Sequence, residues 1–163
     1  MSNTIRTLTG LTTITAVGSG LAGGVFFAFS SFVMPALRRL PDAQGIAAMQ
    51  SINKQAPTPV FMTLLFGTAA MSVGLGIYAV LHRDEPQASW LLGGSASYLA
   101  SIVITAVFHI PRNDKLAKFD PATAESARYW TTYLSQWTAG NHLRTLTCAV
   151  AAGLFTIAAR RAA

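Results

Sequence analysis

The chain has 163 residues, of which 52% are hydrophobic and 11% charged, and its formal net charge is +6. An ordinary soluble domain has roughly 25% charged residues, so this composition argues against a soluble enzyme and a disordered chain. The excess of Lys and Arg does not indicate a nucleic-acid partner, because these residues lie in short connectors beside apolar runs, where they would meet anionic lipid headgroups. The single cysteine, Cys148, excludes an intramolecular disulfide. We therefore expect an integral membrane protein whose first partner is lipid.

Four stretches with almost no charge predict four membrane-spanning helices within a single domain, residues 1–163. The expected spans cover about 7–34, 60–81, 89–110 and 143–159. Among all Asp, Glu, Lys and Arg residues, only Arg144 falls inside one of these windows. A charge at the centre of a bilayer is costly, so this segregation is typical of a chain that crosses lipid. The predicted fold is an all-α four-helix bundle, a multi-pass protein of a bacterial-type inner membrane.

The first predicted span carries Gly20 and Gly24 at Gly-x-x-x-Gly spacing, extended by Ala16 and Ala28. Such a stripe of small residues lets helix backbones approach closely in lipid. We expect Pro35 to end this span.

The connectors predict two further helical segments. A short surface helix is expected over 42–54, with an apolar side made of Ile46, Met49 and Ile52. Asp120 is a good N-cap and Pro121 a good first helical residue. Nothing between residues 122 and 138 breaks that helix, so we expect it to run directly into the fourth span.

One side of the third predicted span carries small and polar residues at every fourth position, namely Gly93, Ser97, Ser101, Thr105 and His109. This side is expected to face the bundle interior. We expect the Ser and Thr hydroxyls of this side to form hydrogen bonds with carbonyls of their own helix rather than to have a function. His109 differs, because an ionisable group facing inward at the membrane boundary is a functional candidate. We expect Pro111 to stop the helix just beyond it.

The connector-side end of the fourth span gathers the residues best suited to chemistry. On a continuous helix, steps of three and four place one set on a common side: Trp130, Tyr133, Trp137, Asn141 and Arg144. With a histidine, this set would suit a flat aromatic molecule with an acidic hydroxyl, because the rings stack and a guanidinium stabilises an oxyanion. His142 lies about 100° around the helix from Asn141, so both reach one centre only if Gly140 distorts the turn.

Two other interpretations of these residues stay open. The aromatic residues can form an interfacial belt, and Arg144 can extend to lipid phosphate. A metal site is weaker, because His109 and His142 have no carboxylate at ligand spacing, Asp114 and Asp120 being the nearest. We predict no metal ligands and no cofactor.

Four stretches carry a family resemblance, namely residues 24–37 (GVFFAFSSFVMPAL), 49–53 (MQSIN), 111–117 (PRNDKLA) and 130–145 (WTTYLSQWTAGNHLRT). On them the chain resembles the anthrone oxygenase-like family of small membrane proteins. Its characterised fungal members resemble cofactor-independent oxygenases that convert an anthrone to an anthraquinone with dioxygen. The resemblance implies that the family's motif positions are held here by Asn53, Asn113, Trp130, Trp137, Asn141, His142 and Arg144. The chain departs from the family pattern at His109, often Asn, and at Gly140, where a bulkier residue is usual.

These observations give two hypotheses. The first is a cofactor-independent monooxygenase acting on a hydrophobic anthrone- or phenol-like molecule. In it His109 or His142 is the base, Arg144 and Asn141 hold the enolate, and the substrate contacts come from Asn53, Asn113, Trp130, Tyr133 and Trp137. The second is a non-catalytic four-helix membrane module that binds a lipid, a quinone or a partner protein. Assembly into a homo-oligomer is compatible with either.

Overall fold

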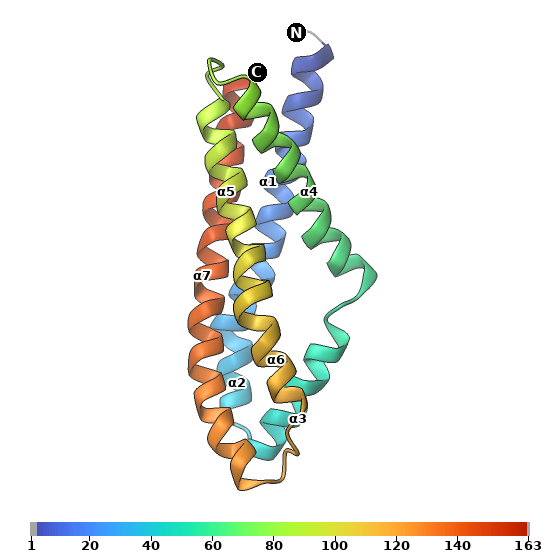
Figure 1. Cartoon of the computed structure of the whole chain (residues 1–163), viewed down its shortest axis with the longest axis vertical. Coiled ribbons are helices and arrows are strands. Elements are labelled where there is room, and N and C mark those ends of the chain that lie inside the picture. Colours follow the sequence, from blue (N-terminus) through green and yellow to red (C-terminus); the bar gives the residue numbers. More distant parts are fainter. Residues whose placement is uncertain (1–2, 163) are drawn as a thin grey trace.

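The computed structural model describes residues 3–162, and every regular element in that range is a helix (Figure 1). In chain order the elements are α1 (Asn3–Ala28), η1 (Phe29–Val33), α2 (Met34–Arg38), α3 (Asp42–Gln55), α4 (Pro59–Leu81), α5 (Ala88–Ile104), η2 (Thr105–His109), α6 (Ile110–Ala117) and α7 (Ala124–Ala162). Four continuous helical rods are long and apolar enough to cross a membrane: Ile5–Arg38, Pro59–Leu81, Ala88–Ala117 and Ala124–Ala162. The predicted all-α fold with four spans is confirmed.

α7 is the axis on which the bundle is built. It runs the length of the molecule and packs most extensively against α1 and then against α5, while α4 packs on α5 and α1 (Figure 1). α1 begins and α7 ends at one end of the bundle, whereas α3 and the α6–α7 connector lie at the other. Towards Pro59, α4 diverges from the other rods. We call the end with α3 the connector end and the opposite one the terminal end.

Neither Pro35 nor Pro111 stops its helix, contrary to the expectation from the sequence. The chain continues as α2 after the first proline and as α6 after the second, and each proline follows a one-turn π-helix, η1 or η2. A proline ring collides with the carbonyl four residues earlier, which here belongs to Ser31 or Val107 inside the π-turn. The wider π-turn makes room for the ring, so the helix bulges and continues.

The small residues that allow close helix packing on α1 are not the predicted pair. Gly20 and Gly24 are exposed, and a Cβ built on Gly24 would meet nothing within 4 Å. A Cβ on Gly23, by contrast, would lie 3.0 Å from Cβ of Cys148, so this glycine permits the close approach of α1 to α7. Of the predicted stripe, Ala16 is buried in the core, whereas Gly20 and Gly24 face outward and Gly23 faces α7.

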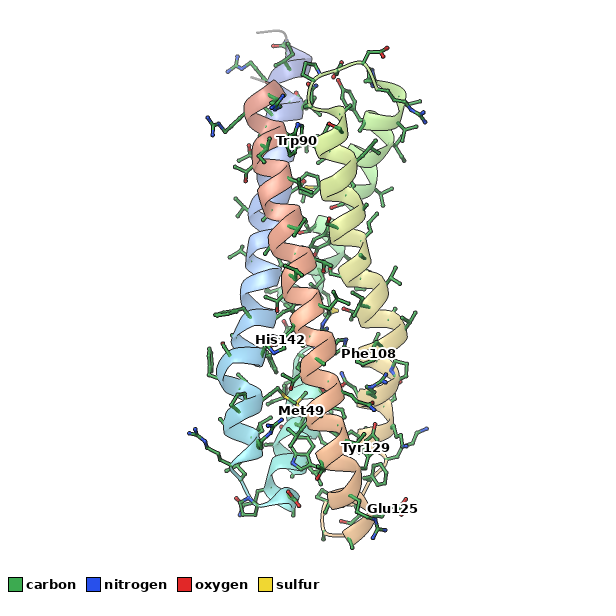
Figure 2. All side chains as sticks on the ribbon, turned by 90° about the vertical axis from the view of Figure 1, so that its left-hand side faces the viewer. Met49, Trp90, Phe108, Glu125, Tyr129 and His142 are labelled. Atoms are coloured by element: carbon green, nitrogen blue, oxygen red, sulfur yellow. The ribbon has the colours of Figure 1, made fainter. Side chains whose placement is uncertain are left out.

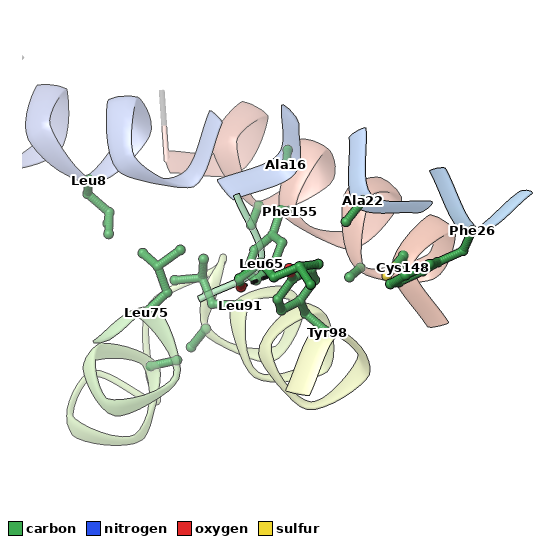
Figure 3. Packing of buried hydrophobic residues seen from close by; sticks show 14 residues of the cluster. Leu8, Ala16, Ala22, Phe26, Leu65, Leu75, Leu91, Tyr98, Cys148 and Phe155 are labelled. Carbon is green, nitrogen blue, oxygen red and sulfur yellow. Dashed lines mark hydrogen bonds between the residues drawn. The ribbon is translucent and has the colours of Figure 1, made fainter. Parts of the chain in front are cut away.

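Towards the terminal end, aliphatic and aromatic side chains pack between the rods, and Tyr98 is one of them (Figure 3). Its side chain is fully buried, and its hydroxyl donates a hydrogen bond of 3.1 Å to the carbonyl of Leu65 on α4. Phe155 of α7 fills the space beside Gly94, where a Cβ would lie 3.0 Å from the ring. The hydroxyl therefore links α5 to the backbone of α4 inside the core.

The predicted surface helix is α3, and its apolar side packs onto the bundle. Ile46 and Met49 are fully buried against α7, and Ile52 lies beside them. The Gln50 amide donates two hydrogen bonds of 2.9 Å, to the carbonyls of Leu116 and Phe119, which closes the end of α6. α3 therefore packs across the connector end of the bundle and covers it.

The start of α7 differs in detail from the predicted start. Asp120 accepts a hydrogen bond of 3.0 Å from the Ala122 amide within the turn, and helix begins only at Ala124. The N-cap is Thr123, whose hydroxyl accepts from the Ser126 amide at 3.2 Å. The predicted extension of the fourth span is otherwise present, because α7 is one helix of 39 residues.

We expect Tyr98→Phe to lower the free energy of unfolding by about 1 kcal/mol, because the Leu65 carbonyl loses an interhelical donor where water is absent. Thr13→Val is a suitable control, because its exposed hydroxyl bonds only to Thr9 of its own helix. Unfolding in mixed detergent micelles, followed by far-UV circular dichroism, measures both variants. Equal stability of the two would contradict this role for the Tyr98 hydroxyl.

Candidate functional site

Polar side chains from three of the four rods meet where η1 and η2 face α7. We call them the buried polar cluster: Ser30 of η1, Thr105 and His109 of η2, and Asn141 and Arg144 of α7. In Figure 2 the labelled residues Phe108 and His142 show where along the bundle the cluster lies, because they are the sequence neighbours of His109 and Asn141. The cluster lies between the hydrophobic core and the connector end. Two π-turns border it, and π-turns are frequent at functional sites.

Asn141 holds the cluster together. Its side chain is fully buried, and its Nδ2 donates hydrogen bonds of 2.6 Å to the Phe26 carbonyl and to Oγ of Ser30. Its Oδ1 accepts from Nη2 of Arg144 at 2.6 Å. One amide thereby joins α1 and η1 to the guanidinium one turn further along α7.

Arg144 is a buried cation without a carboxylate partner among its hydrogen bonds. Only 6% of its surface is exposed, and besides Asn141 its Nη1 donates to Oγ1 of Thr105 at 3.3 Å. Its Nε is buried without a hydrogen-bond partner. The guanidinium carbon lies 4.2 Å from the ring centroid of Phe26 and 5.3 Å from that of Trp137. Neutral acceptors and ring faces surround the guanidinium, so none of these partners neutralises its charge.

His109 lies in the same cluster, 1% exposed. Its Nδ1 lies 3.4 Å from the Ile104 carbonyl oxygen and its Nε2 lies 3.3 Å from that of Trp137. A neutral imidazole carries one N–H, so one ring nitrogen faces a carbonyl with its lone pair. After the ring takes up a proton, both nitrogens have an acceptor. The Trp137 ring packs edge-on against the imidazole, with centroids 5.0 Å apart.

Below the cluster, towards the connector end, aromatic side chains of α7 form a continuous wall. This aromatic wall consists of Trp130, Tyr133 and Trp137, exposed by 1%, 1% and 4%. The rings face α3 and α6 inside the bundle, so the expected interfacial belt is not formed by these residues. Oδ1 of Asn113 accepts both the Tyr133 hydroxyl at 2.7 Å and Nε1 of Trp137 at 3.0 Å.

Two donors beside the aromatic wall have no partner. Nε1 of Trp130 and Nδ2 of Asn53 are both buried and without a hydrogen bond. The Asn53 side chain lies next to the Tyr133 hydroxyl. Together with Nε of Arg144, these groups are buried donors whose hydrogen-bonding capacity is not met by a well-formed bond.

Gly140 leaves the space that the His109 ring occupies. A Cβ on Gly140 would lie 2.5 Å from Cε1 of Phe108 and 3.0 Å from Cε1 of His109. The Phe108 ring in turn has the Arg112 guanidinium 3.5 Å from its centroid. The two departures from the family pattern, His109 and Gly140, are therefore in contact, and the absent side chain of one makes room for the other.

All the predicted site residues except one lie in the buried polar cluster or along the aromatic wall, and the two groups meet at Trp137, which contacts His109 and Arg144. His142 is exposed on α7 and does not join the buried polar cluster, while Asn141 points into it. α7 stays a regular α-helix through Gly140, so the distortion that would let both residues point inward is absent. Within residues 3–162 no group of three or more His, Cys, Asp or Glu side chains could hold a metal ion.

Several members of the site were not singled out from the sequence. Ser30 and Phe26 lie inside a stretch quoted for the resemblance, but nothing in their spacing marks them as partners of Asn141. The sequence predicts that the Thr105 hydroxyl bonds to its own helix. It donates to the Ser101 carbonyl at 2.8 Å, and it also accepts from Arg144. The prolines two residues beyond each π-turn were the available signal for the bulges.

The fold and the site define a class of protein: a four-span membrane helix bundle with a buried, unpaired arginine and a histidine at its centre. A family model described as anthrone oxygenase matches residues 60–154. The chain belongs to the anthrone oxygenase family. The matched region runs from α4 into α7 and contains Asn113, Asn141 and Arg144. No curated protein and no solved structure matches the chain.

We expect Gly140→Ala to destabilise the protein by about 1–3 kcal/mol, because the added methyl overlaps the rings of Phe108 and His109. Gly153→Ala is the matched control on the same helix, because its Cβ would meet nothing within 4 Å. Alanine in an open helical position stabilises by about 0.5–1 kcal/mol. Opposite signs for the two variants in thermal unfolding are expected, whereas equal shifts would show that Gly140 has no special role.

Proposed function

We propose that the chain is a membrane-embedded, cofactor-independent oxygenase that acts on a hydrophobic aromatic molecule of anthrone or phenol type. The observation that carries the proposal is Arg144, a buried guanidinium with a free Nε and no carboxylate among its partners. A buried cation of this kind has a strong preference for an anion over a neutral ligand. Membership of the anthrone oxygenase family supports this reaction type, and both the reaction and the substrate are part of the proposal.

In the proposed reaction His109 removes a proton from the acidic C–H of the bound anthrone. The ring exchanges one long carbonyl contact for the substrate, and the new N–H can then bond to that carbonyl. The product of this step is an enolate, delocalised over the aromatic rings. No cofactor takes part in the transfer.

The electron-rich enolate then reduces dioxygen. One electron passes to dioxygen, the two radicals combine into a peroxide at the same carbon, and the O–O bond breaks as the second C–H proton leaves. The carbon becomes a ketone, and the other oxygen atom leaves as water, so anthrone plus dioxygen gives anthraquinone plus water. The four electrons taken up by dioxygen come from the two C–H bonds that are lost.

Arg144 and Asn141 stabilise the enolate in the proposed reaction. In this proposal the free Nε of Arg144 donates to the enolate oxygen, while Asn141 fixes the guanidinium by its 2.6 Å bond. Such a preorganised donor is worth more in a site without water than in solution. It interacts more strongly with the enolate than with the neutral ketone, which is the requirement for lowering a barrier.

The aromatic wall suits the remainder of the molecule. In this proposal Trp130, Tyr133 and Trp137 stack against the substrate rings, and Nδ2 of Asn53 and Nε1 of Trp130 donate hydrogen bonds to its further oxygens. Asn113 orients two members of the wall through Oδ1. A substrate of this kind reaches the site from the lipid phase, where hydrophobic molecules concentrate.

A non-catalytic membrane module is the second candidate, and one observation favours it. All three hydrogen bonds of the Asn141 side chain go to protein groups, as expected for a purely structural link between helices. In that case substitutions in the buried polar cluster lower stability, and no oxygen is consumed with any substrate of this class.

We expect Arg144→Gln to lower the rate of oxygen uptake by about 10²–10³-fold, the loss typical of one oxyanion donor. His109→Gln should lower it by about 10²–10⁴-fold, through loss of the base. Purified protein with an anthrone-type substrate and an oxygen electrode measures both. Arg128→Gln, an exposed arginine earlier on α7, is the matched control for the charge.

His142→Gln separates the two histidines. Because His142 is exposed beside the cluster, we expect this variant to keep the unaltered rate. Circular dichroism of each variant verifies folding. The assignment of the base is refuted by a folded His109→Gln protein that retains full activity, or by loss of activity on replacing His142 instead.

A further inference from the structure

A second set of polar residues lies at the terminal end, far along the bundle from the buried polar cluster. A pocket of about 180 Å³ opens between the start of α1, the turn joining α4 to α5, and the end of α7. Its lining includes Leu8, Tyr78, Glu85, Gln87 and Arg161. Trp90, labelled in Figure 2, marks this end of the molecule. For a chain with four membrane spans, this is the level of the lipid headgroups.

The pocket contains one acidic and one basic side chain. The Glu85 carboxylate accepts hydrogen bonds from the Tyr78 hydroxyl, at 2.8 and 3.0 Å, and from the Gln87 amide, so neutral groups orient it without neutralising it. The Arg161 guanidinium lies 5.3 Å from the Trp90 ring centroid. A ligand that carries both signs of charge complements this pair better than a singly charged one.

A second pocket continues from the first. It has a volume of about 420 Å³, shares Leu8 and Tyr78 with the first pocket, and is otherwise lined by Asn3, Thr7 and Leu11 of α1. Leu8 and Leu11 lie one turn apart, so the pocket follows α1 towards the apolar part of the span. Leu11 is 43% exposed, and a hydrocarbon chain covering it would bury this apolar surface.

We propose that the terminal end binds an aminophospholipid with a primary ammonium headgroup. The ammonium bonds to the Glu85 carboxylate beside the Tyr78 hydroxyl, the phosphate pairs with Arg161, and one acyl chain follows Leu8 and Leu11. A primary ammonium is preferred to a quaternary one because only the former donates hydrogen bonds to a carboxylate. An anionic headgroup without an ammonium leaves Glu85 unpaired beside a phosphate.

Native mass spectrometry of the full chain, released from detergent with added dioleoyl lipids, tests the headgroup. We expect phosphatidylethanolamine to be retained several-fold more than phosphatidylcholine or phosphatidylglycerol, with stepwise loss along the N-methylated series. Water-soluble glycerophosphoethanolamine should not compete. Equal retention of the three lipids overturns the proposal, and so does competition by the soluble headgroup, because a free metabolite would then be the occupant.

Variants test the two charged residues. Glu85→Gln keeps the shape and the acceptor oxygen of the side chain, and we expect it to lower retention of phosphatidylethanolamine by about tenfold, as for loss of a charge-assisted hydrogen bond. Arg161→Gln should lower phosphatidylethanolamine and phosphatidylcholine alike. Asp84→Asn and Arg83→Gln, exposed on the same turn, are matched controls. Retention unchanged by Glu85→Gln overturns the assignment, and the N-methylated series decides independently of any variant.

Discussion

The arrangement of the site depends on the three hydrogen bonds of Asn141. A side-chain amide buried in a bilayer cannot form hydrogen bonds with water, so its donors and its acceptor must bond to neighbouring helices. Here they are met by a carbonyl of α1, a hydroxyl of η1 and the guanidinium of Arg144. This fixes the rotation of α7 against the first rod. Because residues of one helical side move together, the same rotation turns Trp130 and Trp137 inward.

The two π-turns make that arrangement compatible with the prolines. Without them Pro35 and Pro111 would break or sharply kink the first and third rods at the level of the cluster. With them the rods continue into α2 and α6, which carry the connector end and provide Asn113 for the aromatic wall. The bulge in η2 also brings the Ile104 carbonyl to the His109 ring, five residues later. A local irregularity thus supplies part of the histidine's environment.

Much of the fold follows from the sequence, because charge is excluded from the four spans and the spacing of polar residues on α7 marks its inner side. The pattern is weaker for purely apolar segments. In lipid both the outer and the inner side of a helix are hydrophobic, so periodicity does not tell which glycines of α1 face a neighbour, and Gly23 rather than Gly20 or Gly24 allows the close approach. Whether tryptophans form an outer belt or an inner wall depends on what covers them, here α3. The Gln50 bonds to α6 and the contact of Gly140 with His109 arise from tertiary packing and have no local signal.

The distribution of charge is the basis for proposing an anion rather than a neutral molecule as the ligand of the buried polar cluster. All six acidic residues of the chain lie at connectors or helix ends, and none is a hydrogen-bond partner of Arg144. A carboxylate partner would have lowered the free-energy cost of burying the guanidinium, but it would also have neutralised the positive charge. A buried guanidinium without a carboxylate partner costs stability in the resting protein, and under the proposed function the substrate offsets that cost as it becomes an anion. In the proposed reaction the stabilisation is then largest after proton loss, so Arg144 favours the enolate over its neutral precursor.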